Sequence, residues 1–172
     1  MSVYSVTIPC FAQMLRSLST LLSKGEACAG ERGYDPQILL EARLAADMHT
    51  LARQVQYACT QALEAVQRLT QQPLEALATP ENMAAAQALI ERTLVTLATV
   101  DRAQVEAGAQ RPIAIELANG ITFDMTGNEY AVNWVTPQFY FHLVTAYNIL
   151  RHNGVPLGKA DYVPHMFAYL RQ

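Results

Sequence analysis

Four prolines in this chain stand just after a short polar side chain, and each pair opens a long stretch in which apolar residues recur every three or four positions. The pairs are Thr7 with Pro9, Asp35 with Pro36, Thr79 with Pro80, and Thr136 with Pro137. The polar side chain can accept hydrogen bonds from free N–H groups of a first helical turn, and proline loses no hydrogen bond there. The sequence therefore predicts four helix starts.

The apolar spacing predicts four helices, over residues 9–24, 36–70, 80–105 and 137–153. All eight glycines fall outside these ranges, and Gly25 is expected to end the first helix. The second range is interpreted as one very long helix with a buried seam. Asp47 could cap a separate segment after a break at residues 45–46, although nothing in the sequence requires one.

The period changes between the third and fourth helices. Residues 112–117 and 121–125 alternate apolar with polar or small side chains, and Asn119-Gly120 between them suits a tight turn with positive φ. This pattern predicts a β-hairpin, and residues from 155 onward are expected to form a loop with one terminal turn. The chain is therefore predicted to be a single all-α domain, 1–172, in which a hairpin interrupts a four-helix bundle.

Charge and cysteine content exclude several classes of protein. The net charge is −3, and with only Lys24, Lys159 and ten scattered arginines there is no basic stripe for nucleic acid or an anionic membrane. No apolar run is long enough to span a bilayer. Cys10, Cys28 and Cys59 are odd in number without a C-x-x-C pair, and the N-terminus has no export signal. We expect a soluble, cytoplasmic protein with reduced thiols.

The last predicted helix carries the densest set of chemical groups. At about 100° per residue, His142 falls on the same side as Phe139, Ala146, Ile149 and Leu150. A neutral imidazole there can serve as a metal ligand or a general base. Alternatively it is a packed histidine whose nitrogens are hydrogen-bonded to neighbours, since buried polar groups are normally paired.

Metal binding would need two or three further ligands from other helices. His49 lies one position off the seam of the second helix, and position 146 is alanine, so there is no H-x-x-x-H pair at His142. The other candidates on the second helix, each with a capping or solvated role as its alternative, are Asp47, Gln54, Cys59 and Glu64. The metal hypothesis therefore rests on His142 and His49.

A second side of the same helix presents Tyr140, Tyr147 and Arg151. These residues could line a small-molecule pocket in which the planar guanidinium of Arg151 holds a carboxylate. They could equally form the rim of a subunit interface, with the tyrosines against a partner surface.

The stretches Leu44–Met48, Leu51–Gln56, Phe139–His142 and Leu150–Lys159, together with the expected hairpin, form a recognisable combination. In these features the chain resembles an uncharacterised bacterial family within the DinB/YfiT-like superfamily, over nearly its whole length. The resemblance implies a four-helix bundle, often dimeric, whose better-known members are metal-dependent transferases and isomerases that use low-molecular-weight thiols.

Those members typically take one histidine from the second helix and an H-x-x-x-H pair from a later one. Only His142 aligns with that pair, because its companion position is Ala146, and His49 is a loose counterpart of the first ligand. Because this chain lacks the second histidine of the pair, the resemblance supports the family's fold more strongly than its chemistry.

Two hypotheses about function remain. The one we favour is a metal-free homodimeric module that binds a small molecule or serves a stress response, with its pocket or subunit contact on the last helix. The alternative is a diverged metal-dependent enzyme, a thiol transferase or hydrolase, in which His142 and groups of the second helix hold zinc, nickel or manganese.

Overall fold

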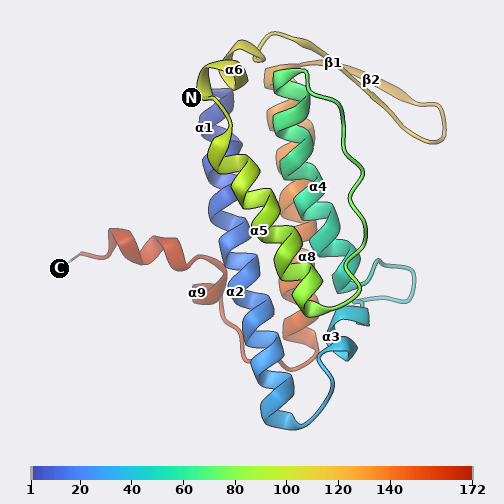
Figure 1. The fold of residues 1–172 in the computed structure, drawn as a ribbon, viewed down its shortest axis with the longest axis vertical. Coiled ribbons are helices and arrows are strands. Elements are labelled where there is room, and N and C mark those ends of the chain that lie inside the picture. Colours follow the sequence, from blue (N-terminus) through green and yellow to red (C-terminus); the bar gives the residue numbers. More distant parts are fainter. Residues whose placement is uncertain (1, 172) are drawn as a thin grey trace.

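The computed structural model describes residues 2–171 as a bundle of four long helices, with a two-stranded hairpin inserted before the last one (Figure 1). The long helices are α2 (Ile8–Arg32), α4 (Leu51–Thr70), α5 (Met83–Thr99) and α8 (Thr136–His152). The short helical elements are α1 (Val3–Val6), α3 (Gln37–Glu41), α6 (Arg102–Ala107), α7 (Gly127–Glu129), α9 (Lys159–Tyr162), the π-helix η1 (Tyr130–Val135) and the 3₁₀-helix η2 (Pro164–Tyr169). The predicted fold class is confirmed.

The expected end of the first helix at Gly25 is wrong. Helix α2 continues through Gly25 and Gly30, and ends at Gly33, whose φ is 73° and whose N–H donates to the carbonyls of Ala29 and Gly30. A glycine inside a helix costs only about 1 kcal/mol. At Gly25 packing offsets that cost, because an added Cβ would lie 3.0 Å from a methyl of Leu150.

The single long helix expected over residues 36–70 is also wrong. The structure divides it into α3 and α4, with residues 42–50 outside any helix. The residue that caps α4 is Thr50, whose side chain accepts from the Arg53 N–H, whereas Asp47 is exposed in the preceding loop. The break places His49 immediately before the first turn of α4.

Two of the remaining helix starts lie within one residue of the predicted positions, since α2 begins at Ile8 and α3 at Gln37. Asp35 does accept from the N–H of Gln37 at the start of α3, but Thr7 uses its hydroxyl to donate to the carbonyl of Val3 instead of capping α2. Helix α5 begins after Asn82, not at Pro80, and does not reach residue 105 because it ends at Thr99.

Helix α8 begins at Thr136, within one residue of the predicted start, but it continues a helical run that begins earlier in the chain. The helical run starts after Thr126, which caps α7 in a capping box with Glu129, and continues through the π-helix η1 into α8. The wider turn of η1 lies directly before Pro137, the residue that cannot donate to the preceding turn. The residue that caps this helical run is therefore Thr126, ten positions before the predicted capping residue Thr136.

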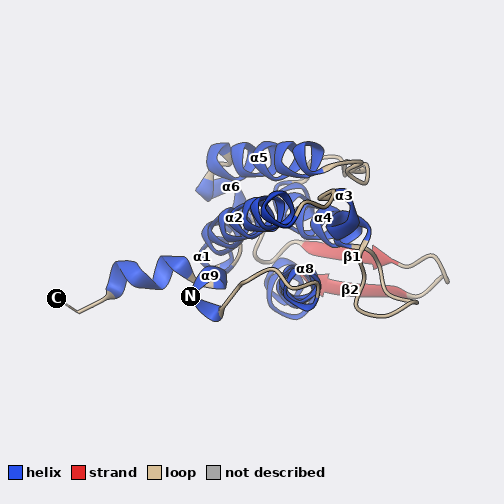
Figure 2. Cartoon of the chain, turned by 90° about the horizontal axis from the view of Figure 1, so that it is seen from below, coloured by secondary structure: helices blue, strands red, loops and turns tan. Residues whose placement is uncertain are grey.

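The hairpin is confirmed. Strands β1 (Pro112–Glu116) and β2 (Thr122–Thr126) pair antiparallel with Ile115 opposite Phe123, and Gly120 has the positive φ of 84° expected for the turn. Seen from below in Figure 2, the hairpin extends to one side of α4 and α8. The tail predicted as loop holds α9 and η2.

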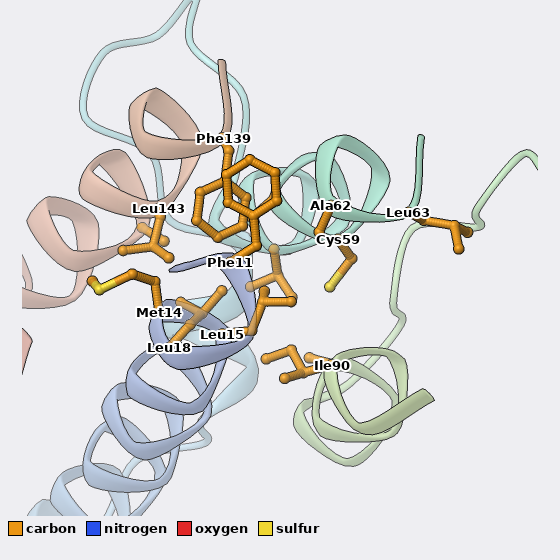
Figure 3. Packing of buried hydrophobic residues seen from close by; sticks show 14 of the residues in the cluster. Phe11, Met14, Leu15, Leu18, Cys59, Ala62, Leu63, Ile90, Phe139 and Leu143 are labelled. Atoms are coloured by element: carbon orange, nitrogen blue, oxygen red, sulfur yellow. The ribbon is translucent and has the colours of Figure 1, made fainter. Parts of the chain in front are cut away.

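The core is formed by the apolar faces of the four long helices. The rings of Phe11 from α2 and Phe139 from α8 stack with centroids 4.3 Å apart, surrounded by aliphatic side chains (Figure 3). Burying each such side chain is worth about 1.5–3 kcal/mol. No helix within residues 2–171 combines the length and the apolarity needed to cross a membrane.

The backbone at Gly108 passes close to the backbone of Leu69. A single methyl group added at Gly108 is therefore expected to clash and to destabilise the fold. A Cβ at Gly108 would lie 2.2 Å from the Leu69 carbonyl oxygen, whereas a Cβ at Gly30 would meet nothing within 4 Å. Gly108→Ala should therefore lower the free energy of unfolding by about 2–3 kcal/mol, measured by urea denaturation. The matched Gly30→Ala should raise it by about 0.5–1 kcal/mol; equal effects would contradict the packing described.

Candidate functional site

His142 lies on α8, facing the first turns of α4. Its Nδ1 is 2.8 Å from Oε1 of Gln54, and Nε2 of Gln54 donates to the backbone carbonyl of His49 at 3.3 Å. A carbonyl oxygen only accepts, so this second bond fixes which way the Gln54 amide points. Oε1 must then accept from Nδ1–H. His142 is thereby held in the tautomer whose Nε2 carries the lone pair.

The ring of His142 is held between aromatic neighbours. Tyr57 stacks on it with centroids 4.9 Å apart, and Phe141 meets it edge-on at 5.3 Å. The ring of His49 is 5.2 Å from that of Tyr57. We call His49, Gln54, Tyr57 and His142 the imidazole cluster.

Arg53 anchors one edge of the imidazole cluster. Its guanidinium donates to the Tyr57 hydroxyl at 2.7 Å and lies over the Tyr57 ring, 4.9 Å from the centroid. It also donates to Gln56 and to Thr79, both at 3.1 Å. Because the Tyr57 hydroxyl accepts from Arg53, its own proton is left to donate elsewhere. Tyr57 is thus held in a fixed orientation beside His142.

Burial, and secondarily the nearby charge of His49, lowers the pKa of His142 to about 4. The ring is therefore neutral near pH 7. A general base works best when its pKa is near the operating pH, so this imidazole is a poor base but a good hydrogen-bond acceptor at Nε2. Within residues 2–171 that nitrogen has no hydrogen-bond partner, and it is not among the buried unpaired atoms.

The donor set around His142 does not fit a divalent metal. Zinc sites of proteins use three or four protein ligands, and no group of three or more His, Cys, Asp or Glu side chains in the described part of the chain could hold an ion. Position 146, one turn after His142, is a fully buried alanine. Asp47 and His49 are exposed in the loop before α4.

Tyr140, Tyr147 and Arg151 lie apart from the imidazole cluster. Tyr147 meets Tyr162 edge-on at 5.9 Å and lines a hollow of about 160 Å³. We call this the tyrosine hollow; it is formed by Val144, Tyr147, Asn148, Lys159 and Tyr162. Burial, with smaller contributions from Cys10 and Tyr162, raises the pKa of Tyr140 to about 12. Arg151 is exposed in the last turn of α8 and has no ion pair among residues 2–171.

The structure thus brings Gln54, His49 and His142 together and separates them from the other candidates. Sequence reasoning missed Arg53 and Tyr57. The available signal was the run of polar side chains at Arg53, Gln54, Gln56 and Tyr57 beside an apolar helical seam, because polar groups on a buried face need partners.

Comparisons with known proteins agree with the observed fold. Residues 3–163 match the family model described as a domain of unknown function, DUF1993. A crystal structure of a DinB family member protein from Shewanella denitrificans superposes with a TM-score of 0.81 at 37% identity, over 93% of this chain and 90% of that one. No curated protein matches the sequence.

The depressed pKa of His142 predicts a pH dependence of stability. Its value is about 4 in the fold and 6.5 for an unperturbed histidine, so below pH 6.5 the unfolded chain binds the proton first. The neutral His142 ring therefore contributes about 1–2 kcal/mol to the free energy of unfolding, after allowance for its partial exposure. This contribution is fully present above pH 6.5 and is lost as the pH falls towards 4. Urea denaturation at pH 7 and pH 4.5 measures it.

The matched variants are His142→Gln and His152→Gln, at a half-buried and an exposed position of the same helix. His142→Gln should remove this part of the pH dependence, and His152→Gln should retain it. Identical pH profiles for the two variants would contradict the assignment to His142.

Proposed function

We propose that this chain, which belongs to the DUF1993 family and has a DinB-like fold, is a metal-independent module that binds a small molecule at the imidazole cluster. The observation that carries the proposal is the chain of hydrogen bonds from the His49 carbonyl through Gln54 to His142. Burial keeps the imidazole neutral, and the hydrogen-bond chain leaves the Nε2 lone pair as a fixed acceptor. A fixed, partly desolvated acceptor is suited to recognising a donor group on a ligand.

The chemistry of the cluster narrows the class of ligand. A hydroxyl, amide N–H or thiol can donate to Nε2 of His142, and the Tyr57 ring supplies an aromatic surface beside it. Phenols combine both features, because the ring stacks while the hydroxyl donates. Arg53 does not add a free positive charge, since its guanidinium already donates to three side chains. We therefore expect a neutral aromatic ligand, bound without reaction.

The alternative function is a diverged metal-dependent enzyme using His142 and His49. It would require ligands beyond those two residues, and the buried methyl of Ala146 stands where a second imidazole of the same helix would be needed. A cytoplasmic location, predicted from the three cysteines, is part of our proposal.

Binding is tested by thermal-shift and calorimetric titration of untagged protein with a series of phenols and the corresponding benzenes. Phenols should raise the melting temperature of the native chain, and benzenes should not, because only phenols can donate to Nε2. His142→Phe keeps the aromatic packing but removes the acceptor, so it should weaken binding at least about tenfold. The control is His152→Phe, the same change at an exposed site, which should bind as the native chain does.

Elemental analysis of the same protein separates the two functions. We expect less than stoichiometric zinc, nickel and manganese, and no change in melting temperature when these ions are added. Stoichiometric metal that disappears in His142→Phe would overturn the proposal in favour of the enzyme. Equal phenol binding by the two variants would show that the ligand site lies elsewhere.

A further inference from the structure

The chain leaves the bundle after α9. Residues 164–171, which we call the C-terminal arm, project away from the body in both views (Figures 1 and 2). The base of the arm is held firmly. Asp161 pairs with Lys24 of α2 and accepts from the Gly158 N–H at 2.7 Å, and Tyr162 packs against Tyr147 of α8. The arm therefore starts from a fixed point and extends outward.

Four of the eight residues of the C-terminal arm have large apolar side chains that are exposed to solvent. Met166, Phe167, Tyr169 and Leu170 are 54%, 61%, 81% and 73% exposed. Single exposed apolar residues are ordinary, but a contiguous group of this size on one short segment marks an interaction site. The arm is thus an unpartnered apolar surface.

The first turn of the arm is poorly packed on its own chain. A cavity of about 390 Å³ lies between it and α2, lined by Pro9, Arg16 and Thr20 among others, and by Pro164 and His165. Nδ1 of His165 is buried without a hydrogen-bond partner among residues 2–171. The first turn of the arm thus leaves an open hollow against α2 and a buried polar atom without a partner.

The bundle does not need the arm to complete its core. The family match ends at residue 163, one residue before the arm begins. None of the fully buried core residues within 2–171 comes from the arm; the last of them is Leu157.

We propose that the C-terminal arm docks on a second copy of this chain, over the outer face of α8 and into its tyrosine hollow, and that the second copy returns the same contact. The hollow is formed by α8 and by α9 at the base of the arm. Arm and acceptor are therefore neighbours on each copy, and one two-fold axis can satisfy both contacts in a closed, isologous pair.

The apolar area favours a second copy as the occupant. Phe141 and Val144 are exposed on α8, and Val132 is exposed on the preceding η1. With the four apolar side chains of the arm they present on the order of 900 Å², against about 800 Å² buried by each partner in a standard interface. The surfaces of one chain are thus sufficient for a stable pair, and both components are present in every copy.

This inference does not depend on the ligand site, because none of its residues belongs to the imidazole cluster. The native chain should sediment as a dimer at concentrations down to the low micromolar range. Phe167→Ser with Leu170→Ser should weaken dimerisation at least about 100-fold, since each buried apolar side chain contributes a factor of ten or more. Far-UV circular dichroism and the melting temperature should show an intact bundle.

The acceptor and the control are tested in the same way. Val144→Arg, in the tyrosine hollow, should also give a monomer. Ile38→Ser with Leu74→Ser changes side chains that are 58% and 50% exposed elsewhere on the surface, and this variant should stay dimeric. A mixture of Phe167→Cys and Val144→Cys chains should form disulfide-linked heterodimers under mild oxidation.

Two results would overturn the proposal. One is a native chain that is monomeric at about 100 μM, a concentration at which even weak specific pairs form. The other is a dimer that survives both the arm and the hollow substitutions. A monomer that binds phosphatidylglycerol vesicles through the arm would assign the arm to a membrane surface and would likewise exclude the second copy.

Discussion

The packing of α4 against α8 is the contact on which the rest of the structure depends. Both helices place small residues on their buried faces, Ala58 and Ala62 on α4 and Ala146 on α8, so their backbones can approach closely. The approach brings Gln54 within 2.8 Å of His142. Ala146 thus allows close helix packing at the position where the DinB-like pattern has a second histidine. Because alanine cannot bind a metal, this position lacks the ligand that the pattern would supply.

The break between α3 and α4 creates the polar part of the site. In an unbroken helix the His49 carbonyl would accept from the Arg53 N–H. Here the side chain of Thr50 accepts from that N–H instead, so the His49 carbonyl is left to accept from Gln54. Gln54 in turn fixes the tautomer of His142. A helix cap therefore determines, through three hydrogen bonds, which nitrogen of His142 is available to a ligand.

Helix α8 has three different surfaces. One side is buried in the core through Phe139 and Leu143, an edge carries His142 against α4, and the outer side exposes Phe141 and Val144. A helix that is apolar on more than its core face is expected to meet another partner. The binding and the pairing that we propose are separate uses of one element, since they occupy different sides of it.

The helical class, the hairpin and the helix that carries His142 could all be predicted from the amino-acid sequence. These follow from apolar spacing and from the Asn119-Gly120 turn, which act between residues close in the chain. The ends of the helices depended on tertiary structure. Capping and glycine each change helix stability by only about 1 kcal/mol, and packing such as that of Gly25 on Leu150 can outweigh this amount. Tertiary structure also decided the site: Gln54 and His142 are 88 residues apart, and only the folded bundle makes them neighbours.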